Sequence, residues 1–218
     1  MMKTQQEQYY QKLSAGALLA MAAGSIDAYS YLRDGGVFAG LQTGNMILMG
    51  LHLGTGKYEA AMGELFSVFM FMVGIFIIRS LQLRFPAEKE LRRKQITLAW
   101  EILIFVIVAF IPMGVSPLIK TAFLSVAAAA QLQEFRLLKG KPFTSLMMTG
   151  HIRTLSESIF DFVANRDTKA GKIAGRTITI ILFFAIGAFL SGFAMAFIAG
   201  KAILIPAVIL LIAFFFAK

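Results

Sequence analysis

Two polar tripeptides interrupt strongly apolar sequence in this chain, and they occupy equivalent places in two similar stretches. Thr43-Gly44-Asn45 and Thr149-Gly150-His151 lie 106 positions apart, and a short apolar helix is expected after each. Broken helices at matching positions of two halves are the best sequence indication of a solute site in a transporter. Each threonine is expected as a helix N-cap, where its oxygen accepts a first-turn N–H. The remaining N–H groups and the helix dipole would favour an anion or a polar solute; alternatively, both tripeptides only cap a turn.

Asp27 is the strongest single candidate for a functional residue, because it lies well inside an apolar segment. A carboxylate at membrane depth is costly and is a functional-site hypothesis by default. It could bind a cation, relay a proton or hold a substrate amine. The structural alternative is a cap or an interhelical hydrogen bond, for example to Asn45 or Arg153. Gln131 and Gln133 are polar at the corresponding depth of the second half, so we include both in the predicted substrate site.

Two further ionisable residues have competing interpretations. His151 can change its charge near neutral pH, or it can simply be satisfied by a backbone carbonyl. Glu101, beside Trp100, lies inside a later apolar segment and is expected to reach the interface or to pair with Arg92 or Arg93, with a functional role as the less favoured alternative.

The elements that must position these residues are membrane helices. Of the 218 residues, 58% are hydrophobic and 15% are charged, which is too little charge for a soluble domain of this size. The apolar runs are long enough to cross a hydrocarbon core as helices and too long for barrel strands. We expect six spans, at about 12–33, 60–83, 95–113, 117–138, 172–198 and 201–217. Two short helices are expected at about 44–54 and 149–164.

The distribution of basic residues decides whether the short helices cross the membrane. Basic stretches lie at 79–94, 136–141 and 165–176, and the net charge is +9. Cytoplasmic loops carry an excess of Lys and Arg. If both short helices are re-entrant, all three stretches and both termini fall on the cytoplasmic side. If both crossed fully, 79–94 would fall outside, so the re-entrant arrangement is favoured.

The predicted fold is therefore an all-α integral membrane protein with six transmembrane helices plus two re-entrant half-helices. The chain forms one transmembrane domain, 1–218, with repeat one at about 12–113 and repeat two at about 117–217. Each repeat holds three crossings, an odd number, so the two are expected to form inverted-topology repeats.

Several kinds of chemistry are not expected. Cysteine is absent and there are two histidines, which argues against disulfides, a metal site or a thiol nucleophile. No metalloprotease, serine–histidine or paired-aspartate motif is present, so we predict no catalytic residues, no cofactor and no enzyme. The basic loops lack a base-stacking aromatic stripe, so no nucleic acid partner is expected.

The pattern of Asp27, Gly35-Gly36-Val37-Phe38 and Thr43-Gly44-Asn45, with Gln131 and Thr149-Gly150 later, resembles the YoaK-like family of bacterial inner-membrane proteins. The resemblance covers nearly the whole chain. The family is described as multi-pass and of unknown function, so the resemblance implies the fold without naming a substrate. Lys139-Gly140-Lys141-Pro142 and His151 depart from the pattern expected of the family.

These observations together predict a small-solute transporter or channel of the bacterial cytoplasmic (inner) membrane. Its site would lie at mid-membrane between the two half-helix N-termini, with Asp27 and Gln133 beside it. Its partners would be a small polar or anionic solute and the lipid bilayer, and a bundle this small is compatible with a homodimer. The alternatives are a non-transporting scaffold or partner protein and, less favoured, an intramembrane enzyme using Asp27 and His151.

Overall fold

The computed structural model describes residues 9–85, 87–112 and 114–215. Within them the chain is almost entirely helical. The α-helices are α1 (Leu13–Arg33), α2 (Gln42–Gly54), α3 (Tyr58–Arg84), α4 (Glu90–Phe110), α5 (Pro117–Glu134), α6 (Met148–Asn165), α7 (Thr168–Ile198) and α8 (Leu204–Phe215). The 3-10 turns are η1 (Tyr9–Gln11), η2 (Ala87–Lys89) and η3 (Ala199–Ile203). The expected span ends at 113 and 217 lie outside the described residues.

Helix bounds agree closely with the expectation from hydropathy, and both short helices are present as α2 and α6. The largest shift is at α4, which begins at Glu90 rather than near 95. A 2.6 Å ion pair between Lys94 Nζ and Glu90 Oε1 spans one turn there, and such i,i+4 pairs stabilise a helix start that hydropathy does not detect.

The connection between α5 and α6 differs from the prediction. Helix α5 ends at Glu134, before the expected 138, and the chain forms a hairpin of β1 (Leu137–Leu138) and β2 (Lys141–Pro142). Lys139 and Gly140 adopt φ values of 51° and 75° at its tip. Two consecutive residues with positive φ are typical of the tight turns that join antiparallel strands.

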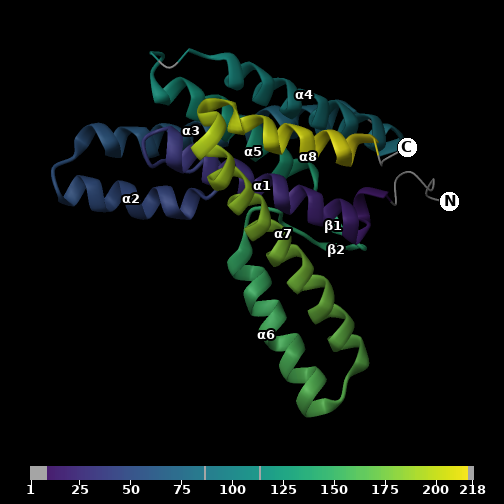
Figure 1. Cartoon of the computed structure of the whole chain (residues 1–218). Coiled ribbons are helices and arrows are strands. Elements are labelled where there is room, and N and C mark those ends of the chain that lie inside the picture. The colour runs from purple at the N-terminus through teal and green to yellow at the C-terminus, as the bar shows by residue number, and fades with distance from the viewer. Residues whose placement is uncertain (1–8, 86, 113, 216–218) are drawn as a thin grey trace.

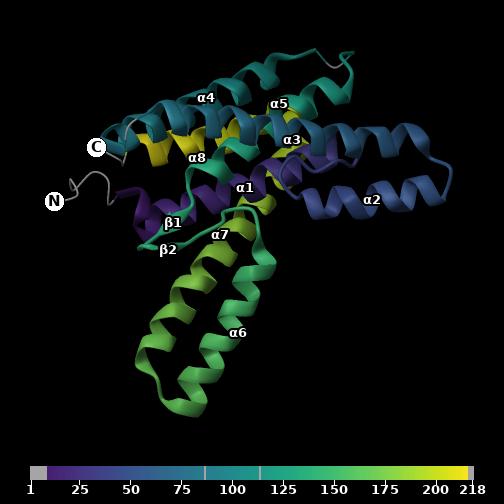
Figure 2. The same cartoon turned by 180° about the vertical axis from the view of Figure 1, so that it is seen from behind.

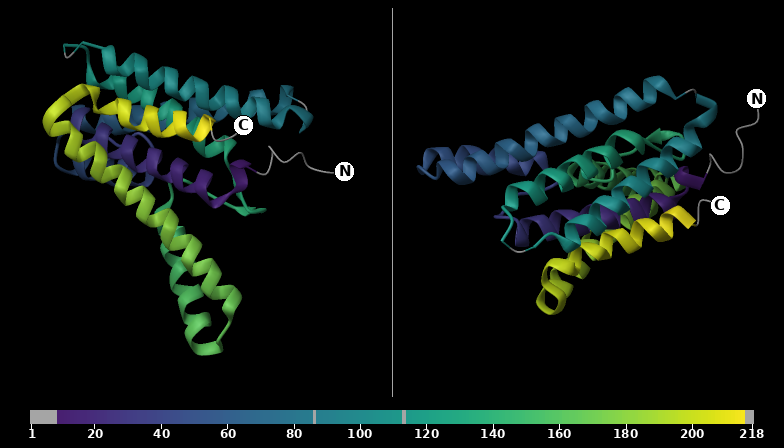
Figure 3. Two further views of the ribbon diagram at one scale, coloured as in Figure 1. Left: turned by 45° about the vertical axis from the view of Figure 1, so that its right-hand side comes forward. Right: turned by 90° about the horizontal axis from the view of Figure 1, so that it is seen from above.

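The helices form an elongated bundle with one projecting arm (Figure 1). Helices α1, α3, α4, α5 and α8 lie roughly side by side, and α2 lies along α3. Helix α6 and the first half of α7 diverge from the bundle as a two-helix arm, which the rear view and the turned views also show (Figures 2 and 3). The start of α1, the β-hairpin and the end of α8 share one end of the bundle, called here the terminal end.

Helix packing follows a pattern that the two halves share. Helix α1 packs on α7 and α5 packs on α3, while α2 packs on α3 and α6 on α7. Helix α1 also packs on α8, as α5 does on α4. If α1–α4 correspond to α5–α8, every one of these pairings has its counterpart in the other half.

Glycines permit the closest crossings. A Cβ built on Gly187 would collide with the Met21 carbonyl oxygen, and one on Gly24 with the Phe184 carbonyl oxygen. Helices α1 and α7 therefore meet backbone to backbone, as small residues allow in membrane bundles. Ser25 and Ser191 are hydrogen-bonded across this crossing at 2.7 Å between their hydroxyl oxygens.

Among the residues that the structure describes, two helical segments are long and apolar enough to cross a membrane: Tyr58–Arg84 and Thr168–Phe215, with mean hydropathies of 2.2 and 2.5. Large apolar side chains face outward on both, including Phe76 at 71% and Phe189 at 67% exposed. Exposed apolar surface on this scale is expected where the neighbour is lipid rather than water.

Candidate functional site

Asp27 holds the loop that leads into α2. Its Oδ1 accepts hydrogen bonds from the backbone N–H groups of Gly40, at 2.6 Å, and Leu41, at 3.3 Å. The residue is 5% exposed, and Oδ2 has no partner among the described residues. Neither of the side chains considered as interhelical partners from the sequence, Asn45 and Arg153, bonds to it. Asp27 is thus a buried acceptor for loop N–H groups that precede the helix.

Asn45 closes the same loop from the other side. Its amide nitrogen donates to the Phe38 carbonyl at 2.7 Å and to Ser67 Oγ at 3.1 Å, while Oδ1 accepts from the Phe38 N–H at 2.9 Å. Gln42 Oε1 accepts a further bond from Asn45 at 2.9 Å. Asn45 is fully buried with both its donor and acceptor groups bonded, so it acts as a structural clamp.

His151 makes the equivalent contact in the second half. Its Nε2 lies 2.9 Å from the carbonyl oxygen of Thr144, seven residues earlier, just as the Asn45 amide contacts the carbonyl oxygen of Phe38, seven residues before it. The structure therefore shows the second interpretation of His151, in which its ring is hydrogen-bonded to a backbone carbonyl. Gln131 fixes the preceding loop by donating to Ser145 Oγ at 2.7 Å and to a carbonyl of α1 at 3.0 Å.

The expected threonine caps are wrong. Helix α2 begins two residues earlier than expected, with Leu41 at its N-cap, and α6 has Met147 there; neither makes a side-chain capping bond. Thr43 and Thr149 fall inside the first turn of each helix and are exposed. Asp27 provides the hydrogen-bond acceptor near the start of α2 that the sequence suggested for Thr43.

The structure does not bring all of the predicted site residues together. Gln133 does not lie with Asp27; it exchanges hydrogen bonds with Gln82 of α3, at 3.0 Å. Where the two loops meet, a Cβ on Gly40 would collide with the side chain of Leu146 and would lie 3.3 Å from Asp27 Oδ1. Gly44 is packed against Phe38 in the first loop.

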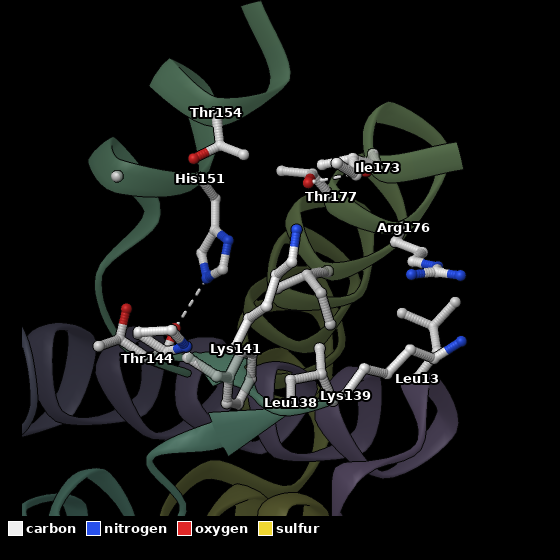
Figure 4. Close-up of a pocket in the computed structure, with 14 residues that line it drawn as sticks. Leu13, Leu138, Lys139, Lys141, Thr144, His151, Thr154, Ile173, Arg176 and Thr177 are labelled. Carbon is white, nitrogen blue, oxygen red and sulfur yellow. Dashed lines mark hydrogen bonds between the residues drawn. The ribbon is translucent and has the colours of Figure 1, made fainter. Parts of the chain in front are cut away.

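Two of the predicted residues, Gly150 and His151, line a cavity of about 340 Å³ between the arm and the bundle, called here the arm cavity (Figure 4). The other lining residues come from α1, the β-hairpin and its loop, α6 and α7: Leu13, Leu138, Lys139, Lys141, Pro142, Phe143, Thr144, Thr154, Ile173, Arg176, Thr177 and Ile180.

The arm cavity is cationic. Lys139 and Lys141 reach it from the hairpin and Arg176 from α7, and none of the described lining residues carries a carboxylate. Lys141 extends toward the space between His151 and Thr177 (Figure 4). Cations collected without a counter-charge create a positive potential that an anion would relieve.

A second cavity, of about 490 Å³, lies at the opposite end of the bundle, called here the far cavity. Its lining includes Arg33, Lys120 and Lys201. Asp34 is buried next to it, with neither carboxylate oxygen bonded among the described residues. Burial raises the pKa of Asp34 to about 7, although the charges of Lys120 and Arg33 oppose this shift.

Sequence reasoning missed the cationic residues of the arm cavity. Lys139, Lys141 and Arg176 fall in stretches whose charge was explained by the positive-inside rule. The turn Lys139-Gly140-Lys141-Pro142, which departs from the pattern expected of the family, was a sequence signal for the two lysines. Nothing in the sequence, however, predicts that this turn lies beside α7.

Comparison with known proteins agrees with the expected resemblance. The chain is 27% identical, over 179 residues, to the UPF0700 transmembrane protein YoaK of Bacillus subtilis (strain 168). The match covers 77% of this chain and 77% of that protein. No solved structure matches the chain. With the two apolar helical segments, this relative supports a membrane protein. A family model matches residues 15–216, and the chain therefore belongs to the family described as "Protein of unknown function (DUF1275)".

Proposed function

We propose that this membrane protein transports a small organic anion, which binds in the arm cavity. The observation that carries the proposal is the lining, which includes Lys139, Lys141 and Arg176 and has no carboxylate among its described residues. Arg and Lys are the natural partners of carboxylate and phosphate groups. The first turn of α6, with Gly150 and His151, adds the positive end of a helix dipole to the same space.

The apolar part of the lining narrows the solute class. Leu13, Phe143 and Ile180 face the cavity beside the cations. A volume of about 340 Å³ is at the lower end of the range for small-molecule sites. A compact apolar body with one anionic head, such as an aromatic carboxylate, suits this lining better than an inorganic ion.

A carrier needs access from two sides, and the two cavities support this requirement. The far cavity is also lined by three cations, at the opposite end from the β-hairpin. An anion would therefore meet positive potential at either end of the bundle.

The proposed architecture has six spans and two re-entrant helices as inverted repeats, with α1–α4 corresponding to α5–α8. The shared packing pattern of the two halves supports it. We place the protein in the bacterial cytoplasmic membrane with its terminal end inside, which agrees with the basic stretch before α4. No enzymatic step is part of this proposal.

Thermal unfolding of the purified protein, in neutral detergent without anionic lipid, tests the binding site. Benzoate is expected to stabilise it more than acetate or phosphate, and neutral benzamide is expected to have no effect. A ligand at 100 times its dissociation constant stabilises by about 2.7 kcal/mol. Arg176→Gln should remove most of this stabilisation. Arg153→Gln is the matched control, because Arg153 is an exposed arm arginine bound to Glu157 and outside the lining.

Uptake of labelled benzoate into proteoliposomes then separates transport from binding alone. If no anion stabilises the wild type, or Arg176→Gln binds normally, the proposal is wrong. If only phosphatidylglycerol stabilises the protein, the cavity holds a lipid headgroup rather than a transported solute.

A further inference from the structure

Glu101 is an ionisable side chain that the proposed anion site leaves unexplained. It lies in α4, about three turns beyond the start of that helix and two turns beyond Lys94. It is completely buried, and neither carboxylate oxygen has a hydrogen-bond partner among the described residues. Its neighbours in sequence and space, including Leu98, Ile104 and Phe105, belong to the apolar core.

The carboxylate of Glu134 has a different environment from that of Glu101. Glu134, at the end of α5, accepts from Arg93 Nε with both oxygens at 3.0 Å and from Gln82 at 3.3 Å. Its charge acts on Glu101 across the interface between α4 and α5. Glu134 is thus a paired carboxylate at the terminal end, and Glu101 an unpaired one deeper in the bundle. The sequence-based pairing of Glu101 with Arg92 or Arg93 is wrong, because Arg93 pairs with Glu134.

The other helices around α4 bring few charges to Glu101. Helix α8 has no ionisable residue within its described range, and η3 contributes Lys201 at the opposite end of α4 from Glu90. Helix α5 contributes Lys120 at its first turn, far along the helix from Glu134. The remaining ionisable groups on these elements lie toward the terminal end: Tyr10, Glu88, Lys89, Glu90, Arg92, Arg93 and Lys94.

These environments imply opposite charge states. An ionised carboxylate without a partner in an apolar core costs far more than a neutral acid does. The negative charge of Glu134 adds to this cost at Glu101, whereas Arg93 offsets the charge of Glu134. The pair therefore accommodates one proton most easily, and that proton belongs on Glu101.

We propose that Glu101 is a proton-binding site inside the bundle, exchanging its proton with the terminal end through Glu134. This role deepens the proposed function and rests on it in one respect: a proton moving with a monovalent anion would make the transport electroneutral. Asp27 is less suited to that role, because two backbone N–H groups already stabilise its charge.

Infrared spectroscopy of the protein in bilayers tests the site without any knowledge of the solute. A protonated carboxylic acid has its own C=O stretching band, separate from that of a carboxylate. At neutral pH we expect such a band in the wild type and a loss of its intensity in Glu101→Gln. Asp34, whose pKa is raised by burial to about 7, contributes to the same band, and Asp34→Asn removes that contribution. Glu157→Gln is the control, since that residue is exposed on the arm and its substitution should leave the band unchanged.

Two further measurements decide the interpretation. Glu101→Gln preserves shape and neutrality, so its melting temperature should match the wild type; a large loss would mean that Glu101 is ionised and held by an unseen partner, which overturns the proposal. Glu134→Gln removes the neighbouring charge, so the Glu101 band should disappear at lower pH than in the wild type. An acid band of undiminished intensity in Glu101→Gln also overturns the proposal. Neither result depends on benzoate binding, so failure here is distinct from failure of the anion site.

Discussion

Gly40 packs against the side chain of Leu146, and the two residues stand 106 positions apart, at the same place in the two halves. Equivalent residues of a pseudo-symmetric pair can touch only near the axis that relates them. The contact therefore lies where an internal twofold axis would pass, between the loops that precede α2 and α6. It supports the inverted-repeat proposal.

Single-cysteine labelling tests the proposed orientation directly. The chain has no cysteine, so Lys57→Cys and Thr168→Cys each introduce one exposed thiol without any prior substitution. A membrane-impermeant maleimide applied to intact cells should label position 57 and spare position 168. Equal labelling at both positions would contradict opposed half-helices and with them the inverted repeat.

Gly187→Ala should destabilise the protein by about 1–3 kcal/mol, because the new methyl group would meet the Met21 carbonyl at a backbone-to-backbone crossing. Gly175→Ala in the same helix is the matched control. No atom lies within 4 Å of its added Cβ, so it should stabilise α7 by up to about 1 kcal/mol. Thermal unfolding in detergent measures both, and equal effects would show that α1 and α7 do not cross as described.

Asp27→Ala should cost about 1–3 kcal/mol, because it removes the acceptor of the buried Gly40 N–H and of the part-buried Leu41 N–H. Asp27→Asn keeps an acceptor oxygen and should cost less. If Asp27 serves the loop alone, Asp27→Asn will also leave anion uptake and its pH dependence intact. Loss of uptake in a protein of unchanged melting temperature would instead restore Asp27 to the solute site.

Asn45 and His151 occupy matching positions, but their substitution should have different effects. Asn45→Ala removes four hydrogen bonds and should lower the melting temperature strongly, with faster proteolysis of the loop before α2. His151→Ala removes one bond to Thr144 and alters the arm cavity. His151→Ala should therefore weaken anion binding clearly but lower the melting temperature only slightly. The reverse order of effects would show that the two residues do not have these roles.

Asp34 should make stability depend on pH. Its pKa is raised by burial from 3.8 to about 7, so between these values the folded protein binds more protons than the unfolded chain. Stability should therefore fall as pH rises from about 4 to 7, and Asp34→Asn should flatten that dependence. Melting temperatures of both proteins across this range provide the measurement. An unchanged profile in Asp34→Asn would assign the dependence to another group.

Much of the local structure is determined by the sequence, because helix bounds follow from local hydropathy. The ranges of α1, α2, α3 and α6 lie within a few residues of those expected. The hairpin at Lys139-Gly140 was missed, because turn formation there depends on two positive φ values that composition does not reveal. The family resemblance also followed from the sequence, and the match over residues 15–216 confirms it.

Only the tertiary structure decided which polar residues share a site. Asp27, Asn45 and Gln131 were chosen for their depth, but buried polar groups must find partners, and these three fix the loops before α2 and α6. The arm cavity instead joins cations from the hairpin and α7, which are distant in sequence and lie together only where the arm leaves the bundle. Likewise, the sequence alone does not distinguish Glu101 from the other charged residues near the ends of apolar segments. Its burial without a partner results from the way in which the neighbouring helices pack around α4.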